Sequence, residues 1–245
     1  MRPKSPATPR SLKKSEVIAL EVVRDIVRKR LVPGDPLEYE ADMLARYRVS
    51  RSSLREALRL LESQGLITVR PGRGVSVAVG VADAEHLSRT MTLYLHLTGA
   101  TYDQLLDART LTEPLLAMLA AQNPDRARVE RLMTPFLEIS GPCGVDLTAE
   151  SGYSFHDIIA ELADNPVVSL AISAIVQMEG FHIFGINENN ALHEDDVHDH
   201  SLIARAIIDG DAQAAHQTMK DHCAHVAERF RLALSPRVGD KIQWL

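Results

Sequence analysis

The chain has 245 residues, with 27 Lys and Arg against 33 Asp and Glu, so its formal net charge is −6. This length allows one large or two ordinary domains with a buried core. Two cysteines exclude a disulfide framework, no apolar run approaches the roughly 18 residues of a membrane span, and residues 1–15 lack the apolar segment of a secretory signal. We therefore expect a cytoplasmic protein.

Charge is distributed unevenly along the chain. Residues 1–79 hold 16 Lys and Arg against 9 Asp and Glu, whereas the remaining residues hold 11 against 24. A basic amino-terminal module is therefore joined to an acidic body that phosphate would repel. The stretch 1–14 is rich in Pro, Ser, Lys and Arg, which predicts a disordered basic arm.

Three helices are expected within the basic module, and a short turn joins the last two. Ser15 is placed to cap a first helix, which ends before the turn-forming residues 33–36. A short helix over 40–47 is followed by the turn 48–50 and by a helix that Gly65 ends. This helix-turn-helix arrangement places its second helix to enter a DNA major groove. The predicted apolar face of the second helix consists of Leu54, Ala57, Leu58 and Leu61.

The start of this second helix and the hairpin after it both suit DNA. Ser50 is placed to cap the helix, and short hydroxyls and guanidinium groups of this kind read base edges and phosphates. Strands are expected over 66–70 and 75–79, and the turn between them is placed to act as a wing whose arginine reaches phosphate or the minor groove. The candidate DNA-contacting residues are Arg51, Ser52, Ser53 and Arg55 on the helix, and Gly72 and Arg73 on the wing.

Taken together, these motifs resemble the winged helix-turn-helix of the GntR family of bacterial transcriptional regulators. The residues that carry the resemblance are Pro33-Gly34, Leu44-Ala45, Val49-Ser50-Arg51, Leu54-Arg55-Glu56-Ala57-Leu58, Gly65-Leu66 and Gly72-Arg73-Gly74. The resemblance covers residues 17–79. It implies that Arg51, Ser52, Ser53 and Arg55 match operator-contacting positions and that Gly72 lies at the minor groove. We expect this DNA-binding domain over 15–79, followed by a linker over 80–85.

Helical patterns fill the second half of the chain. Thr101 and Gln104 form a capping box, Asn123-Pro124 and Asn165-Pro166 are typical helix starts, and Asp211 is placed to cap the last long helix. The fold class is thus mainly α: a winged helix-turn-helix followed by an all-α bundle of about six helices over 86–235 and a tail over 236–245.

The bundle resembles the FCD effector domain of FadR-type GntR regulators. The residues that carry this second resemblance are Arg109…Glu113, Ala120-Ala121, Phe155-His156, Asn165-Pro166, His200…Ala206, Gly210-Asp211…Ala215 and His222.

Three of the ten histidines lie on predicted core faces of different helices. They are His156, His200 and His222, whereas His216 and His225 share faces with charged residues. If Gly210 and Asp211 turn an antiparallel helix pair, two of these histidines lie level, each about 16 Å from the turn. Three imidazoles favour Zn²⁺ or Ni²⁺. The alternative is that each is an ordinary core histidine hydrogen-bonded to a neighbour.

Two further residues bear on this site. Metal-binding members of the resembled family usually carry Asp where this chain has Gly152, so water, an effector carboxylate or the acidic run 193–200 would complete the coordination. The resemblance makes Arg109 the residue that grips an effector carboxylate. The alternative is a simple Arg109–Glu113 pair within one helix.

These observations predict a ligand-responsive transcriptional regulator, a repressor, that binds a palindromic operator in double-stranded DNA as a homodimer. A small carboxylate metabolite would bind beside a divalent transition metal in the bundle and alter operator binding. Three alternatives stay open: a metal-dependent hydrolase or dioxygenase, a direct metal sensor, and a metal-free regulator that senses an acyl chain.

Overall fold

The computed structural model describes residues 12–70, 76–81, 83–137, 155–182, 194–233 and 239–243. The chain divides into two compact units, Met1–His86 and Leu87–Leu245. The predicted wing tip with Gly72 and Arg73, the position of Gly152 and most of the predicted basic arm lie outside the described residues.

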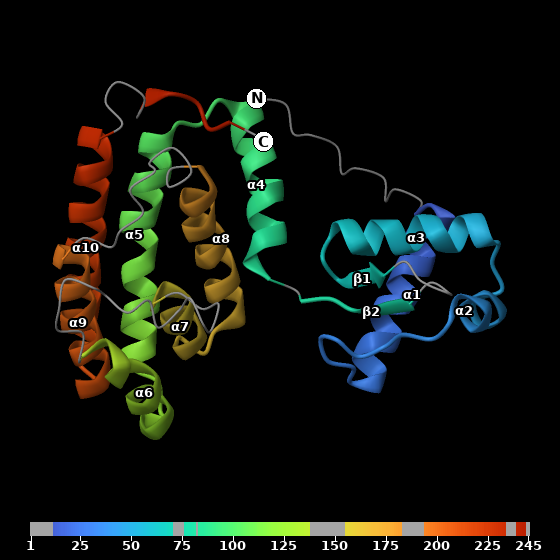
Figure 1. Ribbon diagram of the computed structural model, residues 1–245, viewed down its shortest axis with the longest axis horizontal. Coiled ribbons are helices and arrows are strands. Elements are labelled where there is room, and N and C mark those ends of the chain that lie inside the picture. The colour runs from blue at the N-terminus through green and yellow to red at the C-terminus, as the bar shows by residue number, and fades with distance from the viewer. Residues whose placement is uncertain are drawn as a thin grey trace, which may run out of the picture. The chain divides into compact units, whose positions relative to one another are not determined.

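The amino-terminal unit contains the predicted helix-turn-helix and hairpin (Figure 1). Its elements are α1 (Lys14–Lys29), α2 (Glu40–Tyr47), α3 (Arg51–Ser63), β1 (Ile67–Arg70) and β2 (Ser76–Val79). The two strands pair antiparallel, with Ile67 opposite Val79. The apolar residues predicted for α3 are buried together with Ile18 and Val22 of α1, so the three helices share one core.

The predicted cap of α1 is wrong. Ser15 lies inside the helix and is buried, and the helix begins one residue earlier, at Lys14. Glu16 accepts a hydrogen bond from the backbone N–H of Lys13 at 2.7 Å, so a carboxylate from the first turn satisfies the donor at this end.

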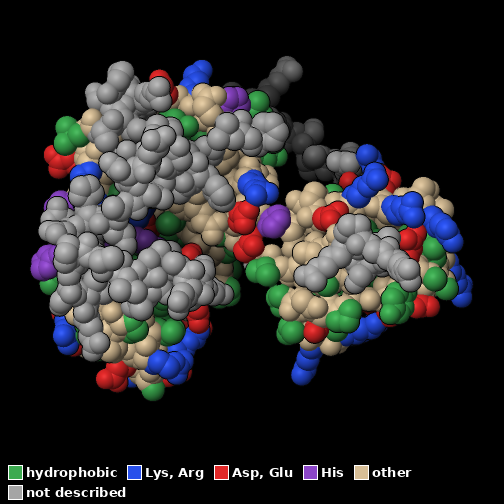
Figure 2. All heavy atoms as spheres, viewed as in Figure 1, with side chains coloured by type: hydrophobic (Ala, Val, Ile, Leu, Met, Phe, Trp, Pro, Cys, Tyr) green, Lys and Arg blue, Asp and Glu red, His purple; other side chains and the backbone are tan. Residues whose placement is uncertain are grey.

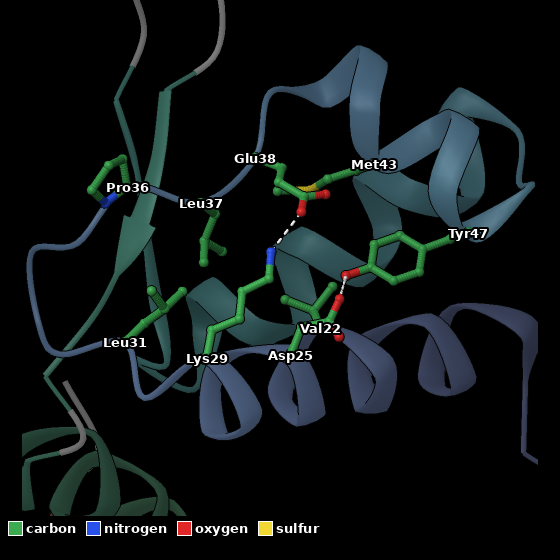
Figure 3. Close-up of a pocket in the computed structure, with 9 residues that line it drawn as sticks. All are labelled: Val22, Asp25, Lys29, Leu31, Pro36, Leu37, Glu38, Met43 and Tyr47. Carbon is green, nitrogen blue, oxygen red and sulfur yellow. Dashed lines mark hydrogen bonds and ion pairs between the residues drawn. The ribbon is translucent and has the colours of Figure 1, made fainter.

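Hydrogen bonds and ion pairs join α1 to α2 and to the segment just before α2 (Figure 3). The hydroxyl of Tyr47 donates to Asp25 Oδ2 at 2.7 Å, and Lys29 Nζ lies 2.6 Å from Glu38 Oε1. Arg46 contacts both carboxylates, at 2.9 Å from Asp25 and 2.5 Å from Glu38. Burial and the bond to Asp25 raise the pKa of Tyr47, which keeps it a neutral donor. Asp25, Lys29, Glu38 and Tyr47 are among the residues that line a cavity of about 90 Å³ between these elements.

The junction after α3 leaves no room for a side chain at two glycines. Gly65 has φ +72°, and a Cβ there would lie 2.4 Å from the ring of His86. A Cβ on Gly80 would lie 2.1 Å from the carbonyl oxygen of Gly65, a backbone atom that cannot swing aside. Gly65, just after α3, therefore packs against the backbone at Gly80 and against the ring of His86.

Gly80→Ala is consequently expected to destabilise the amino-terminal unit by about 3 kcal/mol, because the new methyl group forces the backbone apart. Urea unfolding followed by circular dichroism measures this loss. Gly34→Ala is the matched control: its φ is +91° but nothing lies within 4 Å of its Cβ position, so only about 1 kcal/mol of backbone strain is expected. Equal losses for the two variants would contradict the steric explanation.

The second unit is mainly helical in its described part, as predicted, and Lys241 in its last described segment forms an isolated β-bridge with Thr101. Its helices are α4 (Ala84–Thr98, which begins in the first unit), α5 (Tyr102–Ala121), α6 (Arg126–Met133), the 3₁₀ turn η1 (Thr134–Phe136), α7 (Phe155–Leu162), α8 (Pro166–His182), α9 (Glu194–Asp209) and α10 (Ala212–Ala233). The central helix is α5, which contacts α7, α8, α9 and α10 (Figure 1). No described helix is both long and apolar enough to cross a membrane.

Three of the four predicted caps in this unit are confirmed. Thr101 and Gln104 form the capping box of α5, Asn165 accepts from Val168 N at the start of α8, and Asp211 accepts from Ala214 N at the start of α10. The prediction for Asn123-Pro124 is wrong, since Asp125 caps α6. Asn123 is buried; its side-chain oxygen accepts from Asp125 N at 2.9 Å and its amide donates to the carbonyl of Leu162 at 2.7 Å, so it holds the turn before the helix while Asp125 accepts from the first turn.

Candidate functional site

The amino-terminal end of α3 presents the residues expected to read DNA. Ser50 caps the helix by accepting from the backbone N–H of Ser53 at 3.3 Å. Arg51, Ser52 and Arg55 are exposed and Ser53 is half-buried, while the apolar side of the helix faces the core. Unpaired N–H groups and guanidinium groups at a helix start attract phosphate, and exposed arginines can reach base edges. Lys and Arg side chains gather over this part of the unit in Figure 2.

A carboxylate on α2 lies beside this end of α3. Glu40 Oε1 is 3.4 Å from Arg55 Nε, with the arginine side chain 62% exposed. The separation makes this a weak surface ion pair, which Arg55 can leave for a phosphate or a base at little cost. The wing residues Gly72 and Arg73 lie outside the described residues, so their proposed contacts stay predictions.

The three predicted core-facing histidines meet in the helical unit. His156 on α7, His200 on α9 and His222 on α10 each offer one ring nitrogen, and these nitrogens all lie within 4.8 Å of one another. The ring centroids of His200 and His222 are 4.8 Å apart, as expected if the two residues lie level on neighbouring helices. His225 has a side chain 63% exposed and His216 is half-buried, and neither belongs to this cluster.

Two of the clustered histidines are buried and uncharged. Burial, with His156 and His222 nearby, holds the pKa of His200 well below its usual range. Burial lowers the pKa of His222 to about 2. Neutral imidazole carries a lone pair on one nitrogen, which is the form that binds a metal.

The surroundings of His200 leave one of its ring nitrogens in a position that a bound cation would satisfy. Its ring stacks on Phe155 with centroids 4.0 Å apart, which fixes its orientation. Its Nε2 atom is buried and has no hydrogen-bond partner among the described residues. A buried polar atom without a partner is costly, and a cation held by three nitrogens would satisfy it. The residues present therefore fit a transition-metal ion such as Zn²⁺ or Ni²⁺.

An ion pair from α5 borders the cluster. Arg109 is buried and pairs through Nε with Glu113 Oε1, so the predicted pair within one helix is present. Arg109 Nη2 also lies 3.2 Å from His156 Nε2, and Glu113 Oε2 lies 2.5 Å from His156 Nδ1. Burial alone would raise the pKa of Glu113, but Arg109 and His156 outweigh it and hold that pKa well below its usual range. Glu113 is therefore a buried carboxylate against the site.

Two carboxylates touch the histidines, and sequence reasoning anticipated them only in part: Asp199 lies in the acidic run 193–200 that was expected to offer a carboxylate, but its contact with His222 was not predicted. Asp199 Oδ2 lies 3.3 Å from His222 Nδ1 and 3.5 Å from His225 Nδ1. Glu113 was considered only as a partner of Arg109, although it also contacts His156. The available signals were an acidic residue next to His200 in the chain, and the position of Glu113 one turn after an arginine on an apolar stripe.

Comparison with known proteins identifies two family matches. Residues 14–77 match the model of bacterial regulatory proteins of the gntR family, and residues 104–225 match the FCD domain. The transcriptional repressor NanR of Klebsiella aerogenes is 28% identical over 89% of this chain and 86% of its own. The galactonate operon transcriptional repressor of Escherichia coli is 26% identical over 90% of this chain and 98% of its own. The solved structure of Streptococcus agalactiae GntR, 22% identical, shares the fold with a TM-score of 0.62, over 87% of this chain and 99% of that one.

Proposed function

We propose that a small carboxylate and a transition-metal ion together control the affinity of this chain for operator DNA. The proposal starts from the family: the chain belongs to the GntR family of bacterial regulatory proteins and carries an FCD domain. The chain is a transcriptional repressor of this type. Its relatives are named as repressors or regulators, so it is not the metal-dependent enzyme considered above.

In this proposal the start of α3 reads the operator. Arg51 and Arg55 contact base edges, and Ser52 and Ser53 contact phosphates or bases. The exposure of three of these four side chains around a capped helix start supports the assignment. The wing adds Gly72 and Arg73 at the minor groove. A homodimer would present two such helices to half-sites about 10 base pairs apart, or a multiple of that spacing.

The observation that carries the ligand part of the proposal is the buried histidine cluster beside a buried guanidinium. His156, His200 and His222 would hold the ion, and Arg109 would bind the carboxylate. When bound, the metal supplies a positive charge at which a carboxylate oxygen can coordinate. Burial strengthens both attractions, because little water screens them.

Fluorescence anisotropy on an operator selected from random duplexes tests this function. Metal-stripped protein is titrated alone, with Zn²⁺, and with Zn²⁺ plus galactonate or acetate. Galactonate is chosen because one relative is named for a galactonate operon. We expect Zn²⁺ with one of these carboxylates to change the operator dissociation constant between about 5-fold and 150-fold, the usual range of coupling between sites.

The other outcomes separate the alternatives. A full change with Zn²⁺ alone, and none added by carboxylates, would identify a direct metal sensor. An operator affinity that responds to neither the metal nor the carboxylates would contradict the proposal.

A further inference from the structure

His156 is engaged at both ring nitrogens by the same pair of side chains. Glu113 Oε2 lies 2.5 Å from Nδ1, a close contact that is poorly aligned for a hydrogen bond. Arg109 Nη2 lies 3.2 Å from Nε2. Because Arg109 Nε also pairs with Glu113 Oε1, the three side chains form a closed triangle. Arg109 and Glu113 are almost completely buried, and the His156 side chain is 16% exposed.

These two contacts select one tautomer of His156. A carboxylate only accepts hydrogen bonds, so a lone pair on Nδ1 would repel Glu113 at this distance, and Nδ1 must carry the proton. A guanidinium only donates, so Nε2 must present a lone pair to Arg109. Nε2 is therefore the His156 nitrogen able to bind a metal, and Glu113 is a positioning residue that keeps it so.

The lone pair on Nε2 cannot serve Arg109 and a metal together. Arg109 must give up this contact whenever His156 is a metal ligand. The guanidinium stays in the site, however, because its Nε bond to Glu113 involves a different nitrogen. With a metal bound, Arg109 Nη2 would no longer donate to His156 and could donate to a carboxylate beside the cation.

We propose that His156 Nε2 exchanges an N–H of Arg109 for the metal, so that metal and carboxylate bind cooperatively, with Glu113 holding both His156 and Arg109 in place. This inference rests on the proposed function and specifies its order: the carboxylate site is complete only after the metal is held. By linkage, the carboxylate must tighten metal binding by the same factor.

Histidine ¹⁵N NMR tests the tautomer in the wild-type protein. In metal-stripped full-length protein, the His156 signals, assigned with His156→Gln, should show a protonated Nδ1 and an unprotonated Nε2. Addition of Zn²⁺ should shift Nε2. A protonated Nε2 in the metal-stripped protein would overturn the proposal.

Calorimetric titration of metal-stripped protein with Zn²⁺ tests the role of Glu113. Glu113→Gln should weaken Zn²⁺ binding by about 10-fold to 100-fold, as for other residues that orient a metal ligand. Asp107→Asn is the matched control, since Asp107 lies on the same helix but is exposed and pairs with Arg231. It should leave the affinity unchanged. Equal affinities for Glu113→Gln and the wild type would overturn the positioning role.

The same titration in the presence of acetate, a small carboxylate probe, tests the coupling. Relative to Arg109→Met, the wild type should show Zn²⁺ binding tightened at least about fivefold by acetate. No acetate effect in the wild type, or an equal effect in both proteins, would overturn the exchange. Either result would leave metal binding by the three histidines standing. A wild type that binds no Zn²⁺ at all would instead refute the proposed function itself.

Discussion

Replacing His200 with alanine is expected to abolish stoichiometric zinc binding by this protein. His200 contributes a buried nitrogen that has no hydrogen-bond partner among the described residues, and its ring centroid lies 5.4 Å from that of His156 and 4.8 Å from that of His222. Two remaining imidazoles cannot complete a tetrahedral site, so the ion would be lost during gel filtration. Elemental analysis after reconstitution with Zn²⁺ should find about one ion per wild-type chain and almost none in His200→Ala.

A matched control distinguishes the site from nonspecific binding to histidine. His225 lies on the same helix as His222 and approaches the same carboxylate, Asp199, but its side chain is 63% exposed. His225→Ala should therefore retain the wild-type zinc content. Equal loss of zinc from both variants, or zinc retained by His200→Ala, would return the three histidines to the role of ordinary core residues.

Operator binding is expected to fall sharply when either arginine at the start of α3 is removed. Arg51→Ala or Arg55→Ala should each cost about 1–3 kcal/mol, which is roughly 5-fold to 150-fold in affinity, because a bidentate contact to a base edge is lost. Fluorescence anisotropy on the selected operator measures the change. The loss should be much smaller on unrelated DNA, where phosphate contacts dominate.

The control for this series removes a positive charge elsewhere. Arg131 is exposed on α6 of the helical unit, so Arg131→Ala changes the net charge by the same amount as the α3 variants. It should leave operator affinity nearly unchanged. If Arg51→Ala and Arg55→Ala bound the operator as tightly as Arg131→Ala, α3 would not be the reading helix.

Elements with strong local signals were predictable from sequence. The bounds of α2 and the caps by Ser50, Thr101 and Asp211 follow from interactions within a few residues, and the structure confirms each of them. The errors at Ser15 and Asn123 have another origin. At the start of α1 the carboxylate of Glu16 accepts from Lys13 N in place of a Ser15 cap. Before α6, Asn123 accepts from Asp125 N and donates to a carbonyl 39 residues away, and Asp125 caps the helix.

The sequence predicted the histidines of the candidate site but not the contacts that surround them. Helical periodicity placed three histidines on core faces, and the turn at Asp211 predicted that two of them lie level. No local pattern shows that Glu113 on α5 would touch His156 on α7, or that Asp199 would touch a histidine of α10. These contacts depend on how whole helices pack. The carboxylates that contact the histidines were therefore harder to predict than the histidines themselves.

The central claim is that the histidine cluster governs operator binding. It is tested most directly by running the anisotropy titration on the wild type and His200→Ala side by side. For each protein, the ratio of operator dissociation constants with and without Zn²⁺ plus carboxylate is measured. We expect a ratio of at least about 5 for the wild type, in either direction, and a ratio near 1 for His200→Ala. Equal ratios well away from 1 in the two proteins would contradict the claim, because the response would not depend on the histidine cluster.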